Sequence, residues 1–222
     1  MTSKIRTVLF DLDGTLADTA PDLARALNEL LIQERRPPLP YEAIRPQVSH
    51  GAKALIALGF GLGPEAPDFE TLRQRLLAIY QAGLCRETKL FPGMAAVLDA
   101  LPARGCNWGV VTNKPAFLTE PLMAALGLDA RAACIVSGDT TVHRKPHPEP
   151  MLHACALAGS RPEQCLYVGD AERDVAAGKI AGMKTLVALF GYIGENERPH
   201  TWGADGLVTE PAEILKWLNE YD

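Results

Sequence analysis

Short apolar segments that alternate with helical patterns are the feature of this sequence that most limits its fold. Five segments are rich in β-branched, leucine or aromatic residues and lack regular polar alternation, which is typical of strands buried on both faces. They are residues 5–10, 107–112, 133–137, 165–168 and 184–189, with a shorter sixth at 206–209. Helical patterns lie at residues 117–126, 150–157, 174–181 and 211–218. This alternation predicts an α/β fold with a doubly wound, Rossmann-like parallel sheet.

A long segment with helical patterns of its own separates the first predicted strand from the second. The patterns lie at residues 21–32, 52–58 and 69–84, and turns rich in proline and glycine separate them. Because a structureless loop of this length is rare in a compact domain, we expect an inserted helical domain at residues 16–88. Residues 1–15 and 89–222 would then form the core.

The charge and composition restrict the partners of the chain. The formal net charge is −5, which argues against binding nucleic acid or an anionic membrane over the whole surface. No apolar run approaches the roughly 20 residues of a membrane span, and the N-terminus lacks the apolar stretch of a signal peptide. The five widely spaced cysteines suit free thiols in a reducing compartment. We therefore expect a cytoplasmic protein with no nucleic-acid or membrane partner, as a monomer or a homodimer.

The strongest chemical signal follows the first predicted strand, where the chain reads Asp11-Leu12-Asp13-Gly14-Thr15. In open parallel sheets the active site lies beyond the carboxyl ends of the strands. Two carboxylates at that place can divide the work of a nucleophile and a proton donor. Gly14 permits a sharp turn, and Thr15 offers a hydroxyl and a backbone donor. An acidic Asp-Gly turn is the ordinary alternative.

Three further polar segments stand near the ends of later predicted strands. Thr112 and Asn113 could hold phosphate oxygens, and Lys145 could neutralise a phosphate. A helix starting at Asp170 would place Asp170 and Asp174 on one side, and their oxygens suit a hard cation such as Mg²⁺. Each segment alone also fits a strand-end turn, an exposed lysine or a helix cap. Their occurrence in this order along the chain favours one shared site.

Together these motifs make the sequence resemble the haloacid-dehalogenase-like hydrolase superfamily over its whole catalytic core, and the helical insertion resembles that family's small α-helical cap. Residues 110–115 (Val-Val-Thr-Asn-Lys-Pro) and 145–150 (Lys-Pro-His-Pro-Glu-Pro) resemble its phosphoglycolate phosphatase branch. The stretch from Gly191 to Asp205 is similar to bacterial members of that branch, which include N-acetylmuramic acid 6-phosphate phosphatases. The resemblance implies a Mg²⁺-dependent phosphatase that acts on a small phosphorylated metabolite.

The resemblance also implies a role for each core motif. Asp11 would be the nucleophile that forms an aspartyl-phosphate, and Asp13 would protonate the leaving alcohol and then activate water. Thr112 and Lys145 would bind the phosphoryl oxygens, with Asn113 in support. The metal ion would be held by Asp11, the backbone carbonyl of Asp13, Asp170 and Asp174, the last directly or through water. The family's dehalogenases and phosphonate-cleaving members lack an acid at the position of Asp13, which favours phosphate-ester chemistry.

The substrate is less well determined than the reaction. Candidate substrate contacts in the core are Gly14, Thr15, Asn113 and Lys114, and those in the cap are Arg45, His50 and Lys53. The cap residues could bind a carboxylate or a hydroxyl of the substrate, although a solvated basic helix start is an equal alternative. The branch implies 2-phosphoglycolate as the substrate, with N-acetylmuramic acid 6-phosphate as the alternative, and both carry a carboxylate. A sugar phosphomutase and a non-catalytic phosphometabolite-binding protein are further alternatives.

Overall fold

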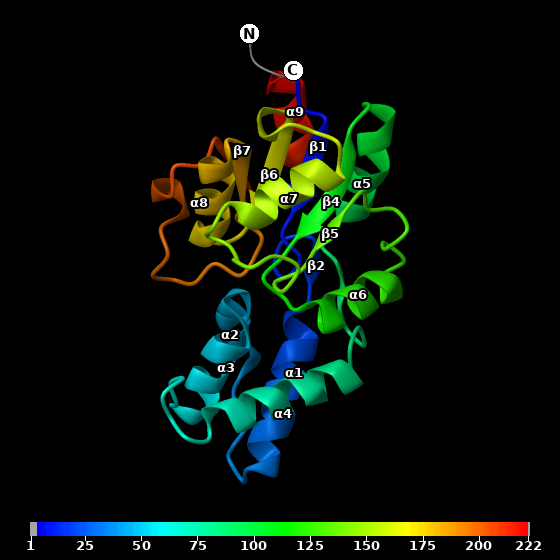
Figure 1. Cartoon of the computed structure of the whole chain (residues 1–222). Helices are drawn as coiled ribbons and strands as arrows, with labels where there is room; N and C mark the ends of the chain where they lie inside the picture. The colour runs from blue at the N-terminus through cyan, green and yellow to red at the C-terminus, as the bar shows by residue number, and fades with distance from the viewer. Residues whose placement is uncertain (1–3, 222) are drawn as a thin grey trace.

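Six parallel strands form the central sheet of the computed structural model, which describes residues 4–221 (Figure 1). In spatial order they are β5 (Ile135–Val136), β4 (Asn107–Val111), β1 (Thr7–Phe10), β6 (Cys165–Gly169), β7 (Lys184–Ala188) and β8 (Gly206–Val208). Every adjacent pair in this sheet is parallel. The predicted α/β fold with a parallel sheet is therefore confirmed.

The first strand lies in the middle of the sheet. Thr7 of β1 pairs with Asn107 of β4 on one side and with Cys165 of β6 on the other. All four β1 residues are buried, as expected of a strand that is covered on both faces. From β1 the chain adds β4 and β5 on one side before it adds β6, β7 and β8 on the other. β1 therefore marks the switch point at which open α/β sheets bind ligands.

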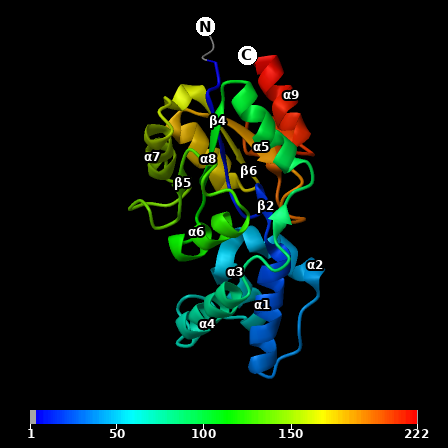
Figure 2. The ribbon, with the colours of Figure 1, turned by 90° about the vertical axis from the view of Figure 1, so that its right-hand side faces the viewer.

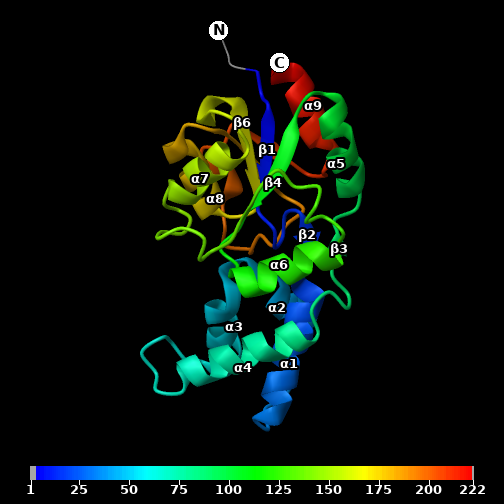
Figure 3. The same ribbon diagram turned by 45° about the vertical axis from the view of Figure 1, so that its right-hand side comes forward.

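Helices cover both faces of the sheet (Figure 3). α7 (Glu149–Leu157) and α8 (Glu172–Ala181) lie on one face, and α5 (Met94–Ala103) and α9 (Ala212–Tyr221) lie on the other. α6 (Ala116–Ala125) lies beside the helical insertion (Figure 2). Short 3-10 segments occupy Pro162–Gln164 and Pro199–Thr201. Within residues 4–221, no helix is long and apolar enough to cross a membrane.

The helical insertion, named the cap from here on, lies beyond the carboxyl ends of the strands (Figures 1 and 2). Its elements are α1 (Ala20–Gln33), α2 (Tyr41–Ile44), a 3-10 segment (Arg45–His50), α3 (Gly51–Phe60) and α4 (Phe69–Ala82). α1 buries Leu23, Leu27, Leu30 and Leu31, whose spacing of three or four residues forms one apolar face. α4 packs across α1 and closes this small helical core (Figure 3).

Two chain segments join the cap to the core, and they lie side by side. β2 (Ala17–Asp18) pairs antiparallel with β3 (Lys89–Leu90), so the chain leaves and re-enters the core at neighbouring points. Next to this pair, the buried carboxylate of Asp22 accepts hydrogen bonds from the backbone N–H groups of Glu87 and Thr88, at 3.1 and 3.0 Å. The Thr88 hydroxyl donates to it at 2.7 Å. These bonds hold the first turn of α1 against the returning segment.

Candidate active site

Three buried carboxylates, those of Asp11, Asp170 and Asp174, form a cluster at the switch point. Each offers one carboxylate oxygen, and these oxygens lie within 4.8 Å of one another. Asp11 directly follows β1 and Asp170 directly follows β6, whereas Asp174 lies in the first turn of α8. The expectation of a helix starting at Asp170 is wrong, because Ala171 is extended and α8 begins at Glu172. The two aspartates nevertheless converge, one from a strand end and the other from a helix.

Lys145 lies within this cluster, and its side chain is fully buried. The ammonium lies 3.0 Å from Asp11 Oδ1 and 2.8 Å from Asp174 Oδ1. It also donates to the Val111 carbonyl at 2.9 Å and to the Tyr167 hydroxyl at 2.7 Å. Burial raises the pKa of Tyr167 well above its usual value, so this hydroxyl stays a neutral partner. Four oxygen atoms therefore fix the position of the lysine.

The cluster has a surplus of negative charge. Burial and, after it, the neighbouring charges of Asp11 and Asp174 raise the pKa of Asp170 to about 7. This repulsion acts even though the ammonium of Lys145 lies beside the other two aspartates. Crowded carboxylate oxygens are the donors that a hard divalent cation such as Mg²⁺ prefers. The residues of the cluster therefore fit such an ion.

A hydroxyl of the cap reaches the Asp170 carboxylate. Ser49 Oγ donates to Asp170 Oδ2 at 2.6 Å, and the backbone N–H of Tyr192 donates to the same oxygen at 2.9 Å. A second hydrogen bond runs from the core to the cap, in which the Arg173 guanidinium donates to the backbone carbonyl of Ser49 at 2.6 Å. Gly14 passes so close that a Cβ there would lie 2.2 Å from Asp170 Oδ2, and its φ of +85° also favours glycine. The cap and the carboxylate cluster are thus joined directly.

Asp13 has different surroundings from Asp11. Lys114 Nζ at 2.9 Å and Thr19 Oγ1 at 2.6 Å both donate to Asp13 Oδ1. Lys114 also donates to the hydroxyl of Tyr80, which lies on cap helix α4, at 3.0 Å. Burial opposes the charged form of Lys114, but Asp13 and Tyr80 outweigh it and raise the pKa of the lysine. Asp13 is therefore oriented by a cation that stays charged.

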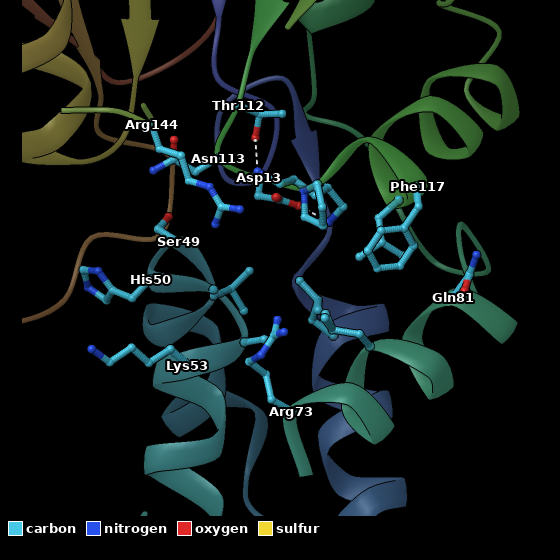
Figure 4. A pocket seen from close by; sticks show the side chains of 18 of the residues that line it. Asp13, Ser49, His50, Lys53, Arg73, Gln81, Thr112, Asn113, Phe117 and Arg144 are labelled. Carbon is cyan, nitrogen blue, oxygen red and sulfur yellow. Dashed lines mark hydrogen bonds and ion pairs between the residues drawn. The ribbon is translucent and has the colours of Figure 1, made fainter. Parts of the chain in front are cut away.

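The segment after β4 holds the loop that carries Lys145. Asn113 Nδ2 donates to the Lys145 carbonyl at 3.0 Å, and Asn113 Oδ1 accepts from the Lys145 N–H at 3.1 Å. Thr112 Oγ1 accepts from the backbone N–H of Lys114 at 3.2 Å (Figure 4). Asn113 therefore positions Lys145, while the Thr112 hydroxyl keeps its own proton for a ligand.

A cavity of about 870 Å³ lies between the cap and the carboxyl ends of the strands (Figure 4). The structure brings these sequence-predicted residues to its wall: Asp11, Asp13, Thr112, Asn113, Lys114, His50 and Lys53. Gly14 and Thr15 lie behind it, against Asp170, with Thr15 Oγ1 3.4 Å from Asp170 Oδ1. Arg45 lies outside the lining, where its guanidinium covers the ring of Tyr192. Arg45 thus joins the cap to the core in this structure.

The motifs do not single out several residues that the structure places at the site. These are Ser49, Arg73, Tyr80, Tyr167 and Arg173. Arg173 directly precedes the candidate ligand Asp174 in the sequence, so it could have been predicted to lie near the site. Ser49 likewise precedes the candidate residue His50, whereas Arg73 and Tyr80 carry no comparable signal, because their positions depend on how the cap meets the core.

Known proteins that are similar to this chain belong to the family that its motifs predict. A model of the haloacid dehalogenase-like hydrolase family matches residues 5–182. An N-acetylmuramic acid 6-phosphate phosphatase from Pseudomonas putida is 41% identical over 216 residues, which cover 97% of each chain. A phosphoglycolate phosphatase from Xanthomonas campestris pv. campestris is 42% identical over 209 residues, which cover 94% of each. The crystal structure of a predicted phosphoglycolate phosphatase from Haemophilus somnus 129pt has a TM-score of 0.85 at 28% identity, covering 98% of this chain and 99% of that one. The chain therefore belongs to the haloacid dehalogenase-like hydrolase family.

Proposed function

We propose that the chain is a Mg²⁺-dependent phosphatase that hydrolyses a small phosphate monoester through an aspartyl-phosphate on Asp11. The observation that carries this proposal is the contrast between two carboxylates two residues apart. Asp11 is buried beside Lys145 and the other aspartates of the cluster, whereas Asp13 is partly exposed at the cavity beside Lys114. One carboxylate is thus placed to attack a bound phosphate, and the other to move a proton.

The hydrogen bonds of Asp11 leave one of its oxygens for attack. The backbone N–H of Leu12 donates to Asp11 Oδ1 at 2.8 Å, and Lys145 lies 3.0 Å from the same atom. In the first step Oδ2 bonds to phosphorus while the ester bond breaks, and Asp13 gives its proton to the leaving oxygen. In the second step Asp13 takes a proton from water, whose oxygen bonds to phosphorus as the bond to Asp11 breaks. Phosphate leaves, Asp11 is again a free carboxylate, and Asp13 is again protonated, as it was at the start.

Asp11, the backbone carbonyl of Asp13 and Asp170 are the ligands that we propose for Mg²⁺. When bound, the ion would neutralise and orient the phosphoryl oxygens. Asp174 Oδ2 accepts from a backbone N–H at 3.1 Å, whereas Oδ1 lies 2.8 Å from Lys145 but is buried without a hydrogen-bond partner among the described residues. We therefore assign Asp174 to holding Lys145 and to contact with the ion, directly or through water.

The comparisons support two substrates equally. Relatives of nearly the same identity, 41% and 42%, are an N-acetylmuramic acid 6-phosphate phosphatase and a phosphoglycolate phosphatase. We assign catalysis to residues 1–15 and 89–222 and substrate selection to the cap at residues 16–88, because the cavity lies between these parts. A cytoplasmic location and a monomeric or homodimeric state stay predictions.

Phosphate release from a panel of monoesters tests the proposal. The panel holds 2-phosphoglycolate, N-acetylmuramic acid 6-phosphate and hexose phosphates, each with Mg²⁺ and with a chelator. We expect release from at least one carboxylate-bearing compound in Mg²⁺, and release near background in the chelator. A rearranged sugar phosphate without release would indicate a mutase. Binding without turnover in Mg²⁺ would indicate a non-catalytic binding protein, and either result contradicts the proposal.

Ser49→Ala is expected to raise the Mg²⁺ concentration needed for half-maximal phosphate release by about tenfold. The change removes one of two donors to Asp170 Oδ2 and leaves only the Tyr192 N–H. A Mg²⁺ titration at saturating substrate measures the shift. Ser160→Ala is the control, since that hydroxyl lies beside Thr7 at the other end of β1. An unchanged Mg²⁺ requirement would show that Ser49 does not orient the carboxylate.

A further inference from the structure

The wall of the cavity is basic although the chain as a whole is acidic. The formal net charge of the chain is −5. In the part of the chain that the structure describes, however, two acidic residues line the cavity, Asp11 and Asp13, against five basic ones. The basic residues are Lys53, Arg73, Lys114, Arg144 and Arg173. A cleft with this local charge attracts anionic ligands.

Four of the five cations already contact charged groups or carbonyls of the protein. Lys114 lies 2.9 Å from Asp13, and Arg173 donates to the Ser49 carbonyl at 2.6 Å. Burial opposes the charge of Arg173, but the carboxylates of Asp174 and its neighbours outweigh it and raise the pKa of the arginine. Arg73 also pairs with Glu70, and Arg144 donates to the Gly138 carbonyl. Each of these two arginines nevertheless keeps at least one terminal nitrogen for a ligand.

Arg144 directly precedes Lys145, yet the two side chains serve different places. Lys145 is buried in the carboxylate cluster, whereas Arg144 is exposed and points into the cavity (Figure 4). Arg144 Nε donates to the Gly138 carbonyl at 2.6 Å, which fixes the direction of the guanidinium. No described residue forms a hydrogen bond or ion pair with its two terminal nitrogens. Arg144, Asp11 and Asp13 line the same cavity, so these nitrogens face the space that a ligand held at Asp11 would enter.

Arg73 enters the cavity from the opposite wall, on cap helix α4 (Figure 4). Its Nε and Nη2 donate to Glu70, one turn earlier, at 2.8 and 2.7 Å. This two-point contact fixes the plane of the guanidinium and leaves Nη1 for another acceptor. Lys53 also lines the cavity, but its side chain is directed away from Arg73 and Arg144 in Figure 4.

We propose that Arg144 and Arg73 together bind a second acidic group of the substrate, a carboxylate carried on a sugar-sized phosphate monoester. This inference rests on the proposed phosphatase function. The cavity of about 870 Å³ lies in the range that encloses ligands much larger than a two-carbon acid. Phe117, 46% exposed, and Gln81 also line it (Figure 4), and they offer an apolar face and an amide to a sugar ring. The two arginines then select for the acidic substituent rather than for the phosphate.

A pair of substrates that differ in one acidic substituent tests the inference. N-acetylmuramic acid 6-phosphate and N-acetylglucosamine 6-phosphate share the sugar, the acetamido group and the phosphate, and only the first carries the lactyl carboxylate. We expect Arg144→Gln and Arg73→Gln each to lower kcat/KM for the first compound about tenfold and to change it less than about twofold for the second. Arg75→Gln is the matched control, because Arg75 lies on the same helix, pairs with Glu34 and is outside the cavity lining.

Three results would overturn the inference and leave the phosphatase function standing. The first is an equal loss of kcat/KM for both compounds, which would place the arginines on the phosphate. The second is an unchanged, wild-type kcat/KM for both compounds in both variants. The third is turnover of 2-phosphoglycolate by a wild-type protein that hydrolyses neither sugar phosphate. A different result, no phosphate release from any compound by folded wild-type protein in Mg²⁺, would overturn the proposed function and the inference with it. Circular dichroism confirms the fold of each variant.

Discussion

Replacing Asp11 with asparagine is expected to lower the rate of phosphate release by about 10⁴-fold or more. An amide is a far weaker nucleophile than a carboxylate, so the aspartyl-phosphate does not form. The fold should persist, because the loss of one negative charge relieves part of the repulsion that raises the pKa of Asp170. Phosphate release from the best substrate of the panel, together with thermal unfolding in a chelator, measures both effects.

Asp99→Asn is the matched control for this substitution. Asp99 is exposed and pairs with Arg131 on the surface, so its variant should keep wild-type activity and stability within about 0.5 kcal/mol. An Asp11→Asn protein that stays within about tenfold of the wild-type rate would contradict the assignment of Asp11 as the nucleophile. A lower unfolding temperature than that of the wild type in the chelator would contradict the surplus of negative charge in the cluster.

Lys145→Met is expected to lower the free energy of unfolding by about 3–5 kcal/mol in a chelator. The lysine side chain is fully buried between Asp11 and Asp174, so its loss leaves buried carboxylates without their cation. Methionine keeps most of the apolar stem, which limits the loss of packing. Urea unfolding followed by circular dichroism measures the change. Phosphate release should fall as well, because the same ammonium lies 3.0 Å from Asp11, the proposed nucleophile, and helps to hold its carboxylate.

Lys184→Met separates this effect from the loss of an ordinary ion pair. Lys184 lies 2.6 Å from Asp205, but the two side chains are 36% and 27% exposed, and such pairs contribute about 0–1 kcal/mol. Equal losses of stability in the two variants would show that Lys145 does not compensate the buried carboxylates. Excess Mg²⁺ should raise the free energy of unfolding of the Lys145→Met variant again in part, because an ion that only the folded cluster binds favours the native state.

The core of the fold could be predicted because each strand depends on a short stretch of chain. A strand covered on both faces needs an apolar run, and the end of a strand fixes where the next residue lies. Asp11, Thr112 and Asp170 could therefore be assigned to one edge of the sheet. The family inferred from these motifs is confirmed by the match to the family model and by the relatives.

Helix α5 and the β2–β3 pair are among the elements that were not expected from the sequence. α5 buries Met94, Val97, Leu98 and Leu101 with helical spacing, but most of its other residues are apolar too, so the pattern is weak. The β2–β3 pair consists of two-residue strands, which are too short to show any alternation. Local periodicity carries little information about elements of either kind.

The contacts between cap and core depend on how two separately packed units meet. Arg45 has the positive charge expected of a residue that binds an anionic substrate, yet its guanidinium lies over the ring of Tyr192 in the core. Ser49 precedes the candidate residue His50 and was not itself a candidate, yet its hydroxyl donates to Asp170. Each unit follows from its own apolar pattern, whereas the docking angle between them follows from neither pattern. The roles of the cap residues therefore stay predictions until the variants are measured.

The central place of β1 has a consequence for folding during synthesis. β1 is synthesised before the other strands of the sheet. Its partner β4 at Asn107 follows a hundred residues later, and its second partner β6 at Cys165 is synthesised after β4. Because synthesis adds about 5–20 residues per second, both edges of this apolar strand stay unpaired for about 5 s or longer. The cap helices can form in that time, since they depend on local contacts. We expect nascent chains that end before β6 to depend on chaperones at this strand. Since Asp170 follows β6, the carboxylate cluster is completed only when the middle of the sheet is complete.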